Sequence, residues 1–295
     1  MTSKQPVPPK KSTKIAYENN PFTIATNGIS ALFNLAKGVA IFLIVISILG
    51  AFSGTSSQSN TAVAPSSDSS QTNSKEELQK ATDKVISDIN AELAKISTEE
   101  WILFGAMAFV IVLAAILFGS LLQGVGAYTA ARVSRGHKVT LKEAFRETLN
   151  RIWPFVWLNI IIGVKTLLWT LLFIIPGFVM SVRYSLAKVA FFDEKKPLRG
   201  NAAVKESLAL TKGAWLTTFA SQVLFSIITL GMLSRLVETA AQSVLYRQLS
   251  ELTHNNELKP AAHPLSWFTL FLPFLLFVLL IGFVVIVALA AIALS

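Results

Sequence analysis

Residues 174–215 read IIPGFVMSVRYSLAKVAFFDEKKPLRGNAAVKESLALTKGAW, and they decide the fold of this 295-residue chain. The stretch joins Pro176-Gly177, a pair suited to a tight turn, to a short apolar segment that carries Arg183 and Lys188. A basic segment follows and ends at a tryptophan. An apolar hairpin followed by a basic interfacial segment is typical of a protein that crosses a membrane more than once.

The composition of the whole chain points the same way. Hydrophobic residues make up 53% of the chain and charged residues 15%, and several apolar runs can cross a hydrocarbon core of about 30 Å. The net charge of +9 indicates basic cytoplasmic loops rather than a nucleic-acid-binding surface. The absence of cysteine excludes disulfides, thiolate metal sites and thiol nucleophiles.

The first hundred residues divide by composition into four parts. Residues 1–28 contain four lysines among Pro, Ser and Asn, which predicts a disordered basic tail on the cytoplasmic side. Residues 29–52 predict an uncleaved first transmembrane span, and residues 53–74 a disordered Ser-rich linker. Residues 75–100 have the spacing of an extracytoplasmic amphipathic helix, which is either solvated or self-associates as a coiled coil.

Residues 101–252 predict a membrane core of two similar units, each with an interfacial amphipathic helix, a tryptophan and a hairpin. The first interfacial helix begins with a capping box at Thr140 and Glu143. The second is expected to be capped by Asn201 and ended by Gly213. The predicted spans of this core cover residues 101–128, 155–175, 178–192, 214–230 and 232–250.

Residues 264–295 form a long uncharged stretch, which predicts a C-terminal transmembrane span. If residues 232–250 also cross the membrane, the chain has seven spans and Ser295 lies outside; otherwise it has six. The predicted fold class is all-α: a polytopic helical membrane protein with a six-helix bundle core, interfacial amphipathic helices and one extra C-terminal span. We expect it in a prokaryotic cell membrane, with its N-terminus in the cytoplasm.

Four segments resemble a known family. GAYTAARVSRGHKVTLKEAF, IIPGFVMSVRYSLAKVAFFDEKKP, NAAVKESLALTKGAW and SVLYRQLSEL look like successive motifs of the YciC-like and glycerophosphodiester phosphodiesterase membrane-domain superfamily, over roughly residues 101–252. The resemblance implies that the tyrosine motif, here Leu245-Tyr246-Arg247, closes the last helix on the cytoplasmic side, which favours seven spans. It implies no phosphodiesterase activity, because in that family the catalytic barrel is a separate soluble domain, and no segment here is long enough to form one.

Charged residues inside the predicted spans are the candidate sites, because a charge near the bilayer centre must be paired, hydrated or near the interface. Counting along the helices from Pro176-Gly177 and Gly231 puts Arg183 and Glu238 at equal depth, which predicts an ion pair between the two hairpins. The alternative is a cavity for an anionic headgroup or phosphate, lined by cations and amides. Its expected residues are Lys165, Arg183, Lys188, Asn159 and Gln222.

The sequence shows no nucleophile with a base, no paired carboxylates and no metal-ligand cluster, so we expect neither an enzyme nor a cofactor. His137, His254 and His263 read as ordinary loop histidines. We expect a lipid-interacting or scaffolding membrane protein; the alternative is a transporter or permease for an anionic or amphipathic solute. The expected partners are anionic membrane lipids and, through residues 75–100, another protein or a second copy of the chain, but no nucleic acid.

Overall fold

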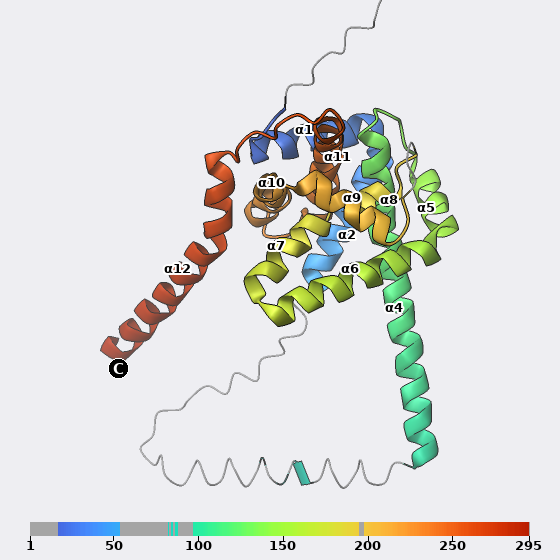
Figure 1. Cartoon of the computed structure of the whole chain (residues 1–295). Coiled ribbons are helices and arrows are strands. Elements are labelled where there is room, and N and C mark those ends of the chain that lie inside the picture. Colours follow the sequence, from blue (N-terminus) through green and yellow to red (C-terminus); the bar gives the residue numbers. More distant parts are fainter. Residues whose placement is uncertain are drawn as a thin grey trace, which may run out of the picture. The chain divides into compact units, whose positions relative to one another are not determined.

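The computed structural model describes residues 17–53, 97–194 and 198–294, together with residues 82, 84, 86 and 87. These residues form eleven α-helices and contain no β-strand, which confirms the all-α class (Figure 1). The predicted linker at residues 53–74 and most of the predicted helix at 75–100 lie outside the described residues. The helices are α1 (Pro21–Leu35), α2 (Lys37–Ser53), α4 (Thr98–Val133), α5 (Leu141–Asn150), α6 (Ile152–Leu172), α7 (Ile174–Tyr184), α8 (Ala187–Phe191), α9 (Asn201–Thr211), α10 (Trp215–Ile228), α11 (Ser234–His254) and α12 (Pro264–Leu294).

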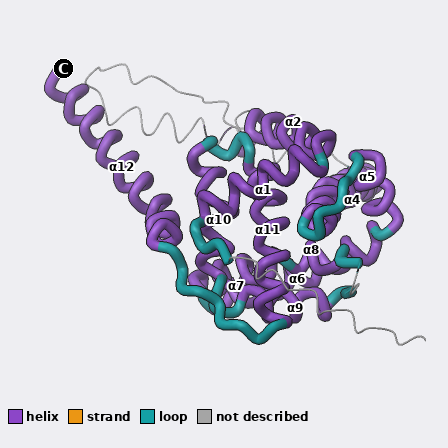
Figure 2. The backbone as a smooth tube through the Cα atoms, turned by 90° about the horizontal axis from the view of Figure 1, so that it is seen from above, coloured by secondary structure: helices purple, strands orange, loops and turns teal. Residues whose placement is uncertain are grey.

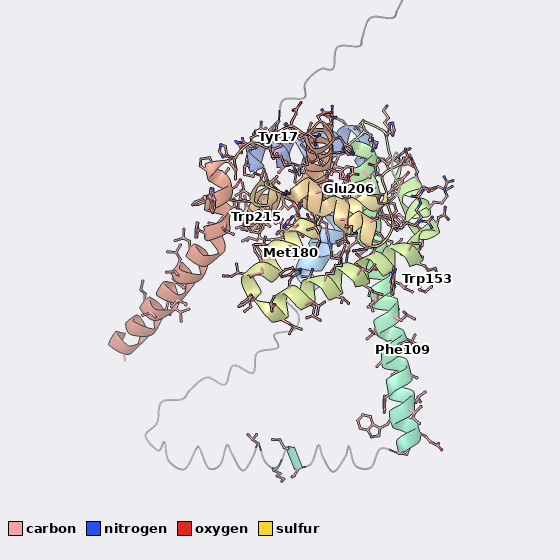
Figure 3. All side chains as sticks on the ribbon, in the orientation of Figure 1. Tyr17, Phe109, Trp153, Met180, Glu206 and Trp215 are labelled. Atoms are coloured by element: carbon pink, nitrogen blue, oxygen red, sulfur yellow. The ribbon has the colours of Figure 1, made fainter. Side chains whose placement is uncertain are left out.

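Two compact units divide the chain: Ser53–Gly119, and Met1–Phe52 together with Ser120–Ser295. Within the described part of the chain, three stretches have the length and apolar composition of membrane-spanning helices: Trp101–Val133, Ile152–Leu172 and Ile174–Phe191. Large apolar side chains on these helices point outward, as Phe109 and Trp153 do at 68% and 66% exposure (Figure 3). So much exposed apolar surface is typical of helices that face lipid, and the protein is a membrane protein with transmembrane helices.

The central helix of the larger unit is α11, which lies among α1, α10, α8 and α9 (Figure 2). Most of its middle turns are buried, and small residues let its neighbours approach closely. A Cβ atom on Gly28 of α1 would lie 2.2 Å from the carbonyl oxygen of Ala240. Hydropathy alone would predict that this helix lies outside the membrane. In the structure it packs against α10 after a turn at Gly231, where φ is +80°. Because other helices shield it, α11 tolerates a polar sequence.

The N-terminal boundary predicted at residue 28 is wrong, because α1 already begins at Pro21. Asn20 caps this helix, with its side-chain oxygen accepting from the backbone N–H of Phe22 at 3.0 Å. Pro21 suits the first helical position because its missing N–H has no partner there. The predicted first span, residues 29–52, is interrupted at Ala36. Its first part belongs to the end of α1, and its second part belongs to α2.

The hairpin between α6 and α7 turns at Phe173, not at the predicted Pro176-Gly177. Phe173 is extended, with φ −158° and ψ 137°, and the Pro-Gly pair lies in the first turns of α7. Gly177 is needed for close packing, since a Cβ there would lie 2.7 Å from the Cα of Thr170. The predicted fourth span, residues 178–192, consists of α7 and α8 with a break at Ser185 and Leu186.

Two helix ends that have a local signal in the sequence lie where the sequence predicts them. Thr140 caps α5 by accepting from the N–H of Glu143 at 3.3 Å, and Gly213 follows the end of α9 with φ +77°. Asn201 is not the cap of α9; Gly200 takes that position with φ +51°. The buried face of α5 packs against protein, with the rings of Phe145 and Phe42 of α2 5.2 Å apart. The predicted C-terminal segment, residues 264–295, forms α12 up to Leu294.

Candidate functional site

A cavity of about 400 Å³ lies between α6, α7, α8, α10 and α11, and we call it the Lys188 cavity. Lys188 lies in α8, which begins at Ala187 after α7 is interrupted at Ser185 and Leu186. Its polar lining comes from Thr166, Ser181, Ser185, Lys188, Gln222 and Glu238. Its apolar walls include Ile162, Phe178, Val182, Phe219 and Val223. Phe178 is 40% exposed and the side chain of Glu238 38% exposed, so the cavity is open to its surroundings.

The ammonium group of Lys188 is only partly satisfied. It donates to Oε1 of Gln123 on α4 at 2.5 Å. Among the residues that the structure describes, no carboxylate forms an ion pair with it and no second acceptor is found. An ammonium has three N–H donors, so two remain available to a ligand. A half-satisfied cation among apolar helices is costly unless an anion or water completes its shell.

The polar and apolar parts of the cavity lie at different depths along the hairpin. Lys188 is three residues before the end of the candidate span at Phe191, or about 4.5 Å along a helix axis. Phe178 lies ten residues before Lys188, roughly 15 Å further toward the exposed tip of the hairpin if the break between α7 and α8 is ignored. Phe178 lies four residues after the span begins at Ile174, so the cavity runs along most of the candidate span, with its cationic end at Lys188 and an apolar end at Phe178.

Glu238 and Gln222 complete the polar end. Oε1 of Glu238 accepts from Nε2 of Gln242 at 3.2 Å, and its Oε2 lies 3.8 Å from Nη1 of Arg235. Nε2 of Gln222 donates to the hydroxyl of Ser185 at 3.2 Å. Lys188 and Glu238 also line a second, much smaller cavity of about 20 Å³ between α2, α4 and α11.

Arg183 is not paired with Glu238, so the predicted ion pair is wrong. Nη2 of Arg183 donates to the carbonyl oxygen of Leu208 at 3.2 Å, in the last turn of α9. Nζ of Lys259 donates to the next two carbonyls, those of Ala209 and Leu210, at 2.9 and 2.7 Å. Two cations thus satisfy carbonyls at the negative end of the helix dipole of α9, which compensates the charge of Arg183.

The contact between α7 and α9 is reciprocal. The carbonyl oxygen of Arg183 accepts from the hydroxyl of Ser207 at 2.6 Å and from that of Thr211 at 3.3 Å. The break at Ser185 removes the usual helical partner of this carbonyl, and α9 supplies the replacement. Arg183 is therefore structural: it holds α9 against the end of α7.

Two other predicted cavity residues also lie elsewhere. Nζ of Lys165 donates to Oδ1 of Asn201 at 2.6 Å, which ties α6 to the start of α9. Nδ2 of Asn159 donates to the hydroxyl of Ser120 on α4 at 3.4 Å. Of the predicted cavity residues, the structure brings together Lys188 and Gln222, with Glu238 beside them.

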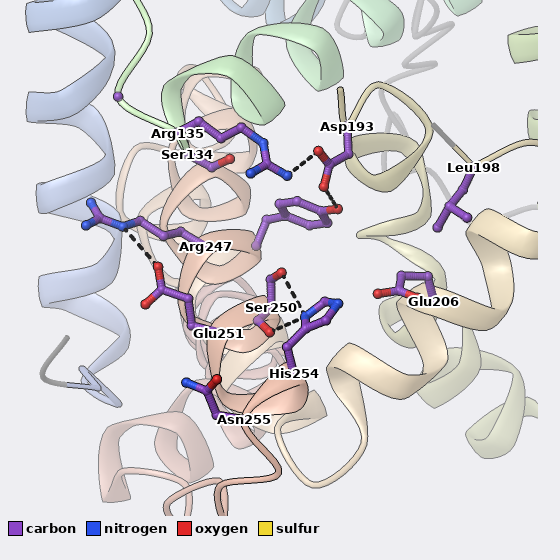
Figure 4. Close-up of a pocket in the computed structure, with 12 residues that line it drawn as sticks. Ser134, Arg135, Asp193, Leu198, Glu206, Arg247, Ser250, Glu251, His254 and Asn255 are labelled. Carbon is purple, nitrogen blue, oxygen red and sulfur yellow. Dashed lines mark hydrogen bonds and ion pairs between the residues drawn. The ribbon is translucent and has the colours of Figure 1, made fainter. Parts of the chain in front are cut away.

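A second pocket, of about 610 Å³, lies where α4, α8, α9 and α11 meet (Figure 4). Asp193, buried at the end of α8, forms an ion pair with Arg135 and accepts from the hydroxyl of Tyr246 at 2.7 Å. Arg247 and Glu251 form an exposed pair at 3.8 Å. The Asp193 interactions join the first, second and last of the quoted sequence segments, and they hold the ends of α4 and α8 against α11.

Neighbouring residues extend this polar network. Arg132 forms ion pairs with Glu194 and, at 3.5 Å, with Glu143. The hydroxyl of Tyr128 donates to Oε1 of Glu143 at 2.8 Å. The network connects α4 with α5 and with the segment after α8. It explains why these charged residues stand at the ends of apolar helices. The buried Nε atoms of Arg132 and Arg135 have no hydrogen-bond partner among the described residues, so the network is not fully satisfied.

No group of three metal-ligating side chains occurs among the described residues. Nδ1 of His254 lies 2.6 Å from the carbonyl oxygen of Ser250, and Nδ1 of His263 accepts from the N–H of Leu265 at 3.2 Å. Sequence reasoning missed Gln123 and Ser185, which contact the cavity residues. The only signal for them was a polar residue inside an apolar run.

Comparison with family models, curated proteins and solved structures found no match to this chain.

Proposed function

We propose that this chain is a multi-pass membrane protein that binds a phosphate-bearing lipid in the Lys188 cavity and acts without catalysing a reaction on it. The observation that carries the proposal is the ammonium of Lys188, with two unused donors at the polar end of a cavity whose other end is apolar. Charge-assisted hydrogen bonds to a phosphate would satisfy those donors. The apolar walls would hold the first part of the acyl chains.

The proposed orientation places the N-terminus, the basic loops and the polar network of Asp193 in the cytoplasm of a prokaryotic cell. The basic segments at residues 132–151 and 195–212 support it, because positively charged loops stay on that side. The same loops would attract anionic lipids of the inner leaflet at about 1 kcal/mol per residue. Residues 75–100 are the proposed contact for a partner protein or a second copy of the chain. Membership of the YciC-like superfamily is a hypothesis.

Native mass spectrometry of the full chain, purified in mild detergent, tests the proposal. Lys188→Met removes the ammonium and keeps much of the side-chain volume. Lys165→Met is the matched control, because both lysines donate a single short hydrogen bond to an amide oxygen. We expect Lys188→Met to lose the phospholipid that wild type and Lys165→Met retain. Equal retention by all three proteins would refute the proposal.

One observation favours transport as a second candidate. Lys188 and Glu238 line both the large cavity and the small one, so these two side chains lie between the two cavities. The small cavity has room for about one water molecule, so transport of an amphipathic solute along this route requires the helices around it to move apart. Flux of a fluorescent phospholipid across proteoliposomes distinguishes the two: a binding protein does not accelerate it, whereas a transporter does so only with Lys188 intact.

A further inference from the structure

Glu238 gives the Lys188 cavity a second charge, of opposite sign. Its carboxylate accepts one hydrogen bond, from Gln242, and lies 3.8 Å from Arg235. A carboxylate offers about four lone-pair sites, so Glu238 can accept from a further donor. Because Lys188 and Glu238 line the same cavity, a ligand there meets both a free cationic donor and a carboxylate acceptor.

We infer that the ligand of the Lys188 cavity is a zwitterion, with a phosphate that binds Lys188 and a primary ammonium that binds Glu238. This inference rests on the proposed function and narrows it to the phosphoethanolamine class of headgroup. A headgroup with negative charge alone would bring its phosphate close to the carboxylate of Glu238 and would offer that carboxylate no cationic donor. A quaternary ammonium carries no N–H and could not donate to Glu238.

The other polar side chains of the cavity fit such a headgroup. Thr166 of α6, Ser181 of α7 and Ser185, which follows α7, supply hydroxyl groups beside the amide of Gln222. Hydroxyls and amides can donate to the remaining phosphate oxygens or accept from the ammonium. The cavity volume of about 400 Å³ accommodates a headgroup and the start of its chains.

The test offers wild type an equal mixture of phosphatidylethanolamine, phosphatidylcholine and phosphatidylglycerol with identical acyl chains, and measures bound lipid by native mass spectrometry. We expect phosphatidylethanolamine to exceed each of the others roughly tenfold, because one charge-assisted hydrogen bond is at stake. Equal or better binding of phosphatidylcholine or phosphatidylglycerol to wild type would overturn the inference. This comparison needs no variant, so it does not depend on how a variant folds.

Glu238→Gln should bring the three lipids within about twofold of one another, since the amide keeps the shape but not the charge. Retention of the full preference in Glu238→Gln would also overturn the inference. Selective binding of phosphatidylglycerol through Lys188 would refute the inference and leave the proposed function standing, whereas wild type that retains no lipid would refute both. If soluble phosphoethanolamine displaces the bound lipid, the cavity recognises the phosphoethanolamine group itself, and a free solute that carries this group is then a ligand too.

Discussion

Replacing Gly28 with alanine should separate α1 from the central helix α11. The added Cβ would lie 2.2 Å from the carbonyl oxygen and 2.5 Å from the carbonyl carbon of Ala240, whereas ordinary contact begins at 3.4 Å. The two helices must therefore move apart by about 1 Å, because both atoms belong to the backbone and cannot rotate away.

The size of the effect follows from two opposing terms. Overpacking of this kind costs about 1–3 kcal/mol, and a gap of about 1 Å forfeits up to half of each dispersion contact along the interface. Alanine in place of glycine inside a helix recovers about 0.5–1 kcal/mol. We expect a net loss of about 2 kcal/mol, or a Tm lower by roughly 4–8 °C if the scaling of globular domains applies.

Thermal unfolding in detergent, followed by tryptophan fluorescence, measures this change. Gly163→Ala on α6 is the matched control, because a Cβ there meets nothing within 4 Å and should leave Tm equal or slightly higher. Glu238 lies two residues before Ala240 on the same helix, so Gly28→Ala should also retain less phospholipid. If both variants melt like wild type, the close approach of α1 and α11 is not a determinant of stability and the packing argument fails.

Two further predictions concern the cations at the end of α9. Arg183→Met should lower the free energy of unfolding by about 1–3 kcal/mol, because it loses the charge-assisted hydrogen bond to the carbonyl of Leu208. The variant should still retain phospholipid like wild type. Loss of lipid with an unchanged Tm would contradict this and show that Arg183 belongs to the binding site. The pKa of Lys259 is lowered from 10.5 by burial first and then by Lys212 and Arg183, so its protonated form is disfavoured in the folded state. Relative to Lys259→Met, wild type should therefore gain stability as pH rises from the lowered pKa toward 10.5, as measured by Tm against pH; a flat or falling difference would contradict this.

Local patterns in the sequence predicted the fold class and several helix ends. Apolar runs, the Thr140 cap and the Gly213 end depend on neighbouring residues alone, and the structure has each of them. The start of α1 was missed because the basic tail before it has no clear end, although Asn20 and Pro21 form a recognisable start signal.

The partner of Arg183 could not be predicted by counting residues. Equal depth of Arg183 and Glu238 requires straight helices and a turn at Pro176, whereas the chain turns at Phe173 and the helix is interrupted again at Ser185. Arg183 and Lys188 lie five positions apart and contact different neighbours, Arg183 the end of α9 and Lys188 Gln123 of α4. A hydrogen-bond partner such as Gln123, 65 residues away in the sequence, depends on tertiary packing that no local pattern records.

The most direct test of the Lys188 cavity is a cryo-electron microscopy map of the full chain in nanodiscs that contain phosphatidylethanolamine. We predict headgroup density within hydrogen-bond distance of Nζ of Lys188, continuous with chain density along Phe178 and Phe219. A cavity filled by protein side chains alone, with Lys188 paired to Glu238, would contradict the account.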